Sequence, residues 1–169
     1  MYTVHATKKL LDRLKEPLTP PVTEPTTVLG NWYATALFWK PQVAMFVNER
    51  TFLPVFVALA PASTLLDRFP AALTDVLRVF GVDPRFVAAE LAAMAEPSVS
   101  KTADRHVLGV MNELALNAEI RVENRIDASD LPGLSVSVAG VLVSPLYKKR
   151  DGAGSPDRAL RALINDHMP

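Results

Sequence analysis

Three strand-like segments in succession constrain the fold of this chain more than any other feature. Residues 32–39, 43–47 and 55–59 are rich in β-branched and aromatic side chains. Turn-forming residues separate these segments at 40–42 and at 48–51. Strands joined by such short connections pair with opposite directions, so the sequence predicts an antiparallel meander.

A proline limits the place of the third segment in that sheet. Pro54 has no backbone N–H and cannot donate to a ladder of hydrogen bonds. The third strand therefore begins at Pro54 or lies at an edge. A further strand is predicted at 2–5, and residues 96–101 are predicted to be extended.

Helical periodicity dominates much of the remaining chain. Thr7 is expected to cap a brief helix that carries three leucines on one face. After the meander, a helix is predicted to begin with Pro70 at its first position and to end at Gly81. The next helix is capped by Asp83-Pro84 and runs to Met94.

The second half holds a long helix, which is predicted from Asp104 to about Glu123. The triplet Ser155-Pro156-Asp157 marks the start of the last helix. Residues 15–27 hold four prolines among threonines and are predicted to form an extended connector. Residues 131–147 suit a strand and a helix equally, and both interpretations stay open.

These patterns predict a single α+β domain over residues 1–169. A small, mostly antiparallel sheet would be packed by several helices, with the long helix at the centre. A chain of 169 residues fits one domain, and a domain of this size buries roughly 70% of its unfolded surface.

The composition excludes several classes of site. The chain has no cysteine, which rules out disulfides, thiol nucleophiles and thiolate metal sites. Its three histidines are scattered, so a histidine metal site within one helix or strand is not expected. The formal net charge is zero, and a nucleic-acid partner would therefore need a local basic patch.

The amino-terminal residues lack the charged-then-apolar order of a signal peptide. Every apolar run is interrupted well before the ~20 residues that a membrane span needs. We therefore expect a cytoplasmic protein that does not enter the membrane. The bias toward Ala, Arg and Pro is typical of a bacterial sequence.

Residues 101–113 form the main candidate site. On the predicted long helix Arg105, Gly109 and Asn112 share one stripe, away from its apolar face. Apolar residues lie among or beside this stripe, so both sides of the helix are expected to be covered; they are Leu108, Leu116 and Ile120. Glycine inside a helix costs about 1 kcal/mol against alanine. The gap at Gly109 suits another backbone, a carboxylate or a phosphate, and ordinary packing is the alternative.

The start of the same helix is a candidate anion site. Lys101, Thr102 and Arg105 surround it, and free N–H groups at a helix start favour anions. The alternative is that Asp104 caps those groups without any ligand. Glu113 is a surface acid if exposed, and an acid–base residue if it lies beside Arg105 in a closed groove.

A second candidate cluster contains Asn48 and Glu49, with Trp32 and Lys8 as further candidates. Asparagine and charge are also ordinary at a hairpin turn, and a large aromatic side chain is usually part of the core. An exposed tryptophan would instead stack a base or a sugar. Lys8 would contribute to phosphate binding only if several basic segments converge in space.

Known catalytic and cofactor motifs are absent from the sequence. It contains no GKS or GKT phosphate loop, no GxGxxG after a strand, and no GxSxG, HExxH or EF-hand loop. We therefore expect no cofactor and no metal, and we assign no catalytic residue. The sequence favours a protein that is not an enzyme.

Four segments together resemble a family of small bacterial proteins that is classed as a domain of unknown function. The segments are ATKKLL at 6–11, NWYA at 31–34, FVNERT at 46–51 and KTADRHVLGVMNE at 101–113. The similarity extends over most of the chain, and the last segment is the most specific. The resemblance implies a stand-alone bacterial domain and brings no activity, cofactor or catalytic residue with it.

The leading functional hypothesis is a non-enzymatic binding or regulatory module. It would recognise an anionic group, either a nucleic-acid backbone or an acidic protein partner. Lys101, Arg105 and Asn112 would make the contacts, with Asn48 and Trp32 nearby.

Two alternatives belong to other classes of protein. In a hydrolase or nuclease, Glu113 or Glu49 would be the general base, and Arg105 or Lys101 would stabilise developing negative charge. In a structural homodimer, the partly apolar face of the long helix would be the contact surface.

Overall fold

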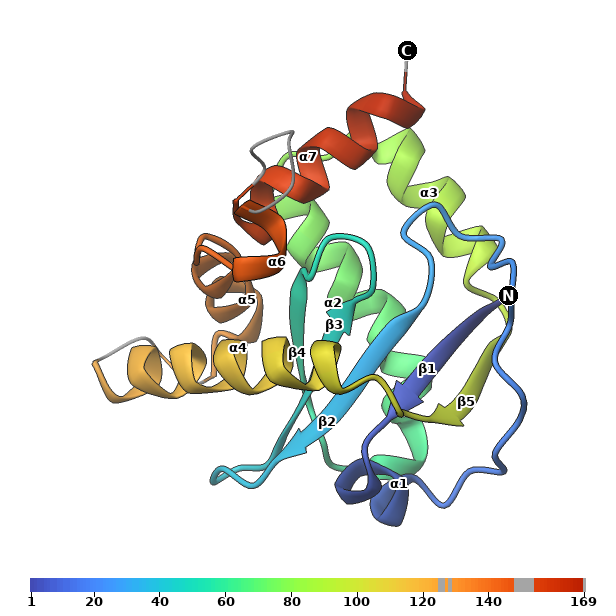
Figure 1. Cartoon of the computed structure of the whole chain (residues 1–169), viewed down its shortest axis with the longest axis vertical. Helices are drawn as coiled ribbons and strands as arrows, with labels where there is room; N and C mark the ends of the chain where they lie inside the picture. Colours follow the sequence, from blue (N-terminus) through green and yellow to red (C-terminus); the bar gives the residue numbers. More distant parts are fainter. Residues whose placement is uncertain (125–126, 128, 148–153, 169) are drawn as a thin grey trace.

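A mixed sheet of five strands forms the centre of the protein (Figure 1). The computed structural model of the 169-residue chain describes residues 1–124, 127, 129–147 and 154–168. The order of the strands across the sheet is β4-β3-β2-β1-β5. The strands are β1 (Tyr2–Ala6), β2 (Trp32–Leu37), β3 (Val43–Asn48), β4 (Pro54–Ala58) and β5 (Pro97–Lys101). The predicted α+β class is confirmed.

The two halves of this sheet are paired differently. Strands β2, β3 and β4 form the predicted antiparallel meander, and Pro54 begins the edge strand β4. Strand β1 lies parallel to both β2 and β5. Parallel neighbours need a long crossover, which helix α1 (Lys8–Leu14) and the following connector provide between β1 and β2. The sheet is therefore mixed rather than mostly antiparallel.

One face of the sheet packs against α1, α2 (Leu65–Val79) and α3 (Pro84–Ala93). Its centre is an aromatic cluster around Phe69. The Phe46 ring stacks on Phe69 with centroids 4.1 Å apart, and the Trp32 ring meets Phe69 edge-on at 4.9 Å. This apolar layer anchors α2 to the middle strands.

Helix α4 (Arg105–Glu123) crosses the opposite face of the sheet (Figure 1). It packs together with α5 (Leu131–Ala139) on β3 and β4. Met45 of the sheet and Leu114 of α4 are fully buried between the layers. The short α6 (Ser144–Tyr147) and α7 (Pro156–His167) complete the described helices.

Several predicted helix starts are confirmed, and one is wrong. Asp83 and Asp104 cap α3 and α4 through their side chains. Pro70 lies inside α2 and not at its first position. Leu65, Phe69 and Leu73 are all fully buried along one side of α2, which favours a helix that continues through the proline.

Thr7 precedes α1, but its side chain does not cap the helix. Its hydroxyl is hydrogen-bonded instead to the hydroxyl of Thr35, at 2.9 Å. The residues between 131 and 147, for which the sequence left two interpretations open, form helices α5 and α6.

The connector at 15–27 is extended and follows the outer edge of β5. The Thr19 N–H donates to the Val99 carbonyl at 2.8 Å, and the Ser100 hydroxyl donates to the Thr19 carbonyl. The Val22 N–H donates to the Thr3 hydroxyl at 2.8 Å. The bond from Thr19 covers the Val99 carbonyl, a backbone group of β5 that an open edge strand would expose.

Candidate functional site

The carboxyl ends of β1 and β5 meet at one edge of the sheet. Ala6 is paired in register with Lys101, and the Thr102 N–H donates to the Ala6 carbonyl at 3.1 Å. Beyond this point, α1 packs on one face of the sheet and α4 packs on the other. In open sheets, ligands bind where neighbouring parallel strands are followed by connections to opposite faces.

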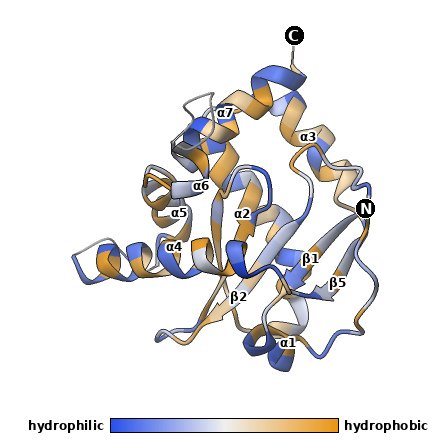
Figure 2. Cartoon of the chain, in the orientation of Figure 1, coloured by the Kyte–Doolittle hydropathy of each residue, from blue (hydrophilic) through white to orange (hydrophobic). Residues whose placement is uncertain are grey.

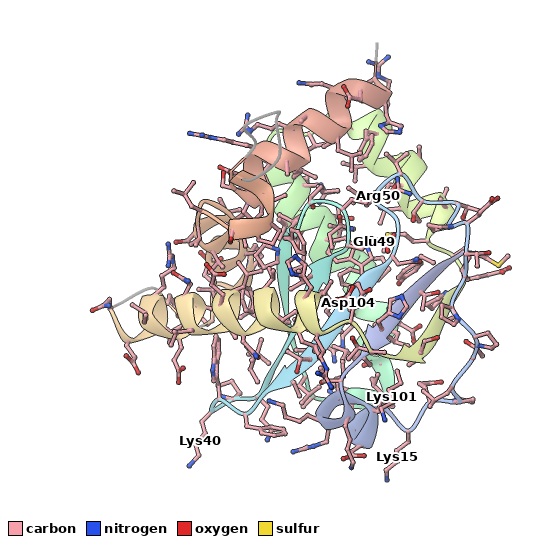
Figure 3. The ribbon with its side chains drawn as sticks, in the orientation of Figure 1. Lys15, Lys40, Glu49, Arg50, Lys101 and Asp104 are labelled. Atoms are coloured by element: carbon pink, nitrogen blue, oxygen red, sulfur yellow. The ribbon has the colours of Figure 1, made fainter. Side chains whose placement is uncertain are left out.

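Cationic side chains gather at this edge. Lys8 begins α1, Lys101 ends β5 and Arg105 begins α4, and all three are exposed. Figure 3 shows Lys101 and Lys15 on the same side of the molecule, near α1. The structure thus brings three of the predicted site residues to the ends of adjoining elements.

The positive charges of these three residues are not neutralised by strong ion pairs with described residues. Lys8 pairs with Asp12 at 3.0 Å, but the two side chains are 80% and 62% exposed, so the pair contributes little. Within the part of the chain that the structure describes, Lys101 and Arg105 form no ion pair.

Thr102 follows Lys101 directly and has a buried hydroxyl. Its Oγ1 atom makes no hydrogen bond to any of the described residues. An unpaired buried polar group costs about 1–3 kcal/mol. The Thr102 hydroxyl therefore keeps unused hydrogen-bonding capacity at the carboxyl edge.

Asp104 caps the start of α4. Its Oδ1 atom accepts hydrogen bonds from the N–H groups of His106 at 2.9 Å and Val107 at 3.2 Å. These N–H groups are therefore used within the protein, as the alternative interpretation proposed. Recognition of an anion at this edge would depend on side chains rather than on those two groups.

His5 and Tyr33 form a stacked pair on the face of the sheet that carries α4. Their ring centroids are 4.7 Å apart and the planes differ by 22°. Burial lowers the pKa of His5, while the nearby carboxylates of Glu49 and Asp104 oppose that change. Burial, Asp104 and Glu49 all raise the pKa of Tyr33.

This pair links the two predicted clusters. Glu49 belongs to the turn after β3 and Asp104 to the start of α4, and both act electrostatically on the same two rings. Figure 3 shows Glu49 and Asp104 close to each other in this view. The sequence interpretation missed His5 and Tyr33. The signal was the alternation of β1, where His5 faces away from the core residue Val4.

Asn48 is fully buried and organises the hairpin between β3 and β4. Its Oδ1 accepts hydrogen bonds from the N–H groups of Arg50 and Thr51 and from the Thr51 hydroxyl. Its Nδ2 donates to the Leu29 carbonyl at 2.8 Å. These contacts give Asn48 a structural role in the hairpin.

Glu49 is half-buried and fixes the loop before β2. One of its carboxylate oxygens accepts the N–H of Asn31 at 2.6 Å. Gly30 lies directly beneath this carboxylate with φ +80°, and a Cβ added there would overlap Oε1 of Glu49. The close approach therefore requires glycine.

Two further charged residues hold the same loop. Glu90 of α3 is 2% exposed and accepts the N–H groups of Val28 at 2.8 Å and Leu29 at 2.9 Å. Burial raises the pKa of Glu90, while these hydrogen bonds oppose the change. Arg50 donates to the Val28 carbonyl at 2.7 Å. No local pattern in the sequence indicates Glu90, because its partners are more than 60 positions away.

Trp32 lies inside the core rather than at a surface. Its side chain is fully buried against Phe69. It therefore cannot stack a base or a sugar from solvent, and its contribution is to packing.

The stripe of α4 that contains Arg105, Gly109 and Asn112 faces solvent. All three residues are exposed, as is Glu113. No atom of the described residues lies within 4 Å of a Cβ added at Gly109, so none of these residues packs into the gap. The expected cover on this side of α4 is not supplied by the part of the chain that the structure describes.

The described residues contain no group of three histidine, aspartate or glutamate side chains arranged to hold a metal ion. None of the helices over those residues combines the length and the apolar character that crossing a membrane would require.

Comparison with known protein families identifies the chain. A family described as "Domain of unknown function (DUF6933)" matches residues 3–159. The chain belongs to this family. The predicted resemblance to a domain of unknown function is thereby confirmed. No curated protein and no solved structure matches the chain.

Proposed function

We propose that this DUF6933 protein is a binding module that takes an anionic group at the carboxyl edge of β1 and β5. Lys101 and Arg105, both exposed, supply the positive charge that pairs with the anion. The observation that supports this proposal is the divergence of α1 and α4 to opposite faces beside these residues.

A phosphate-type group suits this chemistry best. The ammonium of Lys101 can follow a phosphate oxygen on its flexible stem, and the planar fork of Arg105 can bind two oxygens at once. Lys8 approaches from the start of α1. Because the whole chain has no net charge, the attraction is local and weakens as salt is added.

The other predicted contacts have indirect roles in this proposal. Asn112 lies two turns beyond Arg105, about 10 Å along the axis of α4, and a small anion does not need it. Asn48 and Trp32 are fully buried and support the sheet from within.

The surroundings of the two candidate general bases, Glu49 and Glu113, favour a binding role over hydrolysis. Glu49 already accepts the backbone N–H of Asn31, and Glu113 is exposed on α4. Neither carboxylate stands in a closed site beside Lys101 or Arg105, as a general base would need.

Calorimetric titration with pyrophosphate at low salt tests the proposal. The wild type is expected to bind saturably at one site. Lys101→Ala is expected to weaken binding at least about tenfold, because a charge-assisted hydrogen bond contributes about 1.5–3 kcal/mol.

Lys40→Ala is the matched control. Lys40 is an exposed lysine in the turn between β2 and β3, and Figure 3 shows it well apart from Lys101. Its loss should change the affinity less than about twofold, in line with a weak distant charge. Equal losses in the two variants would mean that pyrophosphate binds to surface lysines in general, and the proposal would fail.

A further inference from the structure

The outer face of α4 carries large apolar side chains in solvent. Leu116 is 57% exposed and Ile120 is 45% exposed. At helical spacing they share one stripe with polar residues, which we term the outer stripe. It consists of Arg105, Gly109, Asn112, Leu116, Glu119, Ile120 and Glu123. Figure 2 shows hydrophobic and hydrophilic turns alternating along this helix.

The charges of the outer stripe are separated along the helix. Arg105 stands at the amino-terminal end, and Glu119 and Glu123 stand toward the carboxyl-terminal end. The two exposed apolar side chains lie between Arg105 and Glu123. A surface with this order is complementary to itself when two copies lie antiparallel, because each basic end then faces an acidic end.

From this complementarity we infer that the outer stripe binds the α4 helix of a second copy of this chain. The two helices lie antiparallel about a two-fold axis through the Asn112–Glu113 peptide. Such an interface is isologous, with the same patch on both copies.

Gly109 fixes the register of the two helices. It and Leu116 are equally distant from the Asn112–Glu113 peptide in sequence, so Leu116 of each copy faces Gly109 of the other. The space above Gly109 is open, since nothing lies within 4 Å of an added Cβ. The leucine fills this gap as a knob fills a hole. In the same register, Arg105 reaches between Glu119 and Glu123 of the second copy.

The association should be weak and reversible. Helix α4 has 19 residues, which gives a contact about 28 Å long. A single helix of this length offers less than the roughly 800 Å² per partner that stable interfaces bury. The dimer is therefore expected at high protein concentration, and salt should weaken it by screening the terminal charges.

Sedimentation equilibrium from about 10 μM to about 1 mM protein tests this inference at low salt. The wild type should rise from the monomer mass of 18.4 kDa toward twice that value. Leu116→Glu should remain monomeric, since it introduces a charge at the centre of the interface. Circular dichroism establishes that each variant is folded. Leu142→Glu is the matched control, because Leu142 is 61% exposed and lies outside α4.

A charge reversal tests the antiparallel register. One variant carries Arg105→Glu, and a second carries both Glu119→Arg and Glu123→Arg. Each variant alone should be monomeric, because like charges then meet across the interface. An equimolar mixture of the two variants should associate again, since every Glu then faces an Arg. A wild type that stays monomeric up to about 1 mM, or a mixture that does not recover, overturns the inference.

This inference goes beyond the proposed function and shares only Arg105 with the proposed anion site. A substitution at Leu116 therefore tests the two separately. Leu116 lies away from the carboxyl edge of the sheet. Leu116→Glu should therefore abolish self-association while the affinity for pyrophosphate stays within about twofold of wild type. Loss of both together would contradict a separate dimer surface.

Discussion

The imidazole of His5 stacks on the phenol ring of Tyr33 at 4.7 Å, and the carboxylates of Glu49 and Asp104 act electrostatically on both rings. This pair stands on the face of the sheet that carries α4, next to the carboxyl edge. It joins the turn after β3 to the start of α4, the two regions that the sequence singled out independently. Both regions therefore influence the titration of one imidazole.

The first prediction concerns the charge state of His5. Its pKa is lowered by burial and partly restored by two carboxylates. Glu49→Gln and Asp104→Asn should each lower the pKa of His5 further, because each removes a negative charge that favours the imidazolium. Titration of the imidazole resonances by NMR measures this directly. Both substitutions keep an acceptor oxygen, so the contacts with Asn31 and with the start of α4 are retained.

The same shift predicts how folding stability varies with pH. A histidine whose folded pKa lies below 6.5 stabilises the fold fully above pH 6.5. This contribution is lost as the pH falls through the folded pKa, because the unfolded state takes up the proton first. The unfolding free energy of wild type minus that of His5→Gln should therefore decrease as the pH falls from 7.5 to 5. A difference that grows as the pH falls would contradict the direction of the shift.

A second prediction compares two asparagines. Asn48→Ala should destabilise the fold by about 2–4 kcal/mol, because it leaves several backbone groups of the hairpin without partners. Asn112→Ala, at an exposed position of α4, should change stability by about 0.5 kcal/mol or less. Urea denaturation of both variants measures the contrast. Similar losses at the two positions would show that Asn48 is not the organising residue of its turn.

A third prediction compares two glycines. Gly109→Ala should stabilise the monomer by about 0.5–1 kcal/mol, since the position is helical and has open space around it. Gly30→Ala should destabilise it, because Gly30 has φ +80° and lies against Glu49. Thermal denaturation at low protein concentration separates these effects from self-association.

The meander was predictable because its signals are local. Each connection between β2, β3 and β4 contains its own turn residues, and Pro54 marks where β4 begins. The parallel pairing of β1 was not predictable in this way. It pairs Val4 with Trp32 and Thr3 with Ser98, across 28 and 95 positions, and no local pattern encodes these contacts.

Ser135 explains why residues 131–147 gave conflicting signals. In an alternating segment a serine indicates a solvent-facing position of a strand. Here Ser135 is fully buried within α5. Its hydroxyl donates to the Leu131 carbonyl at 3.0 Å and accepts the Phe56 N–H at 3.1 Å. A polar side chain satisfied by a distant strand therefore hid the helical pattern.

The candidate site was predictable only in part. The sequence identified Lys101, Thr102 and Arg105 from the polarity of one helix start, and the fold adds the edge on which they stand. The sequence did not separate the exposed Lys101 and Arg105 from Asn48 and Trp32, which are buried. Burial depends on the complete set of neighbours, and that information is not local.

The most direct test of the anion site is a map of backbone amide shifts by NMR during titration with pyrophosphate. The proposed site predicts saturable shifts confined to residues 101–107 and to the start of α1 around Lys8. The same residues should lose their response in Lys101→Ala, while Lys40→Ala keeps it. Shifts that do not saturate, or that spread equally over lysines throughout the surface, would contradict a specific anion site at the carboxyl edge of β1 and β5.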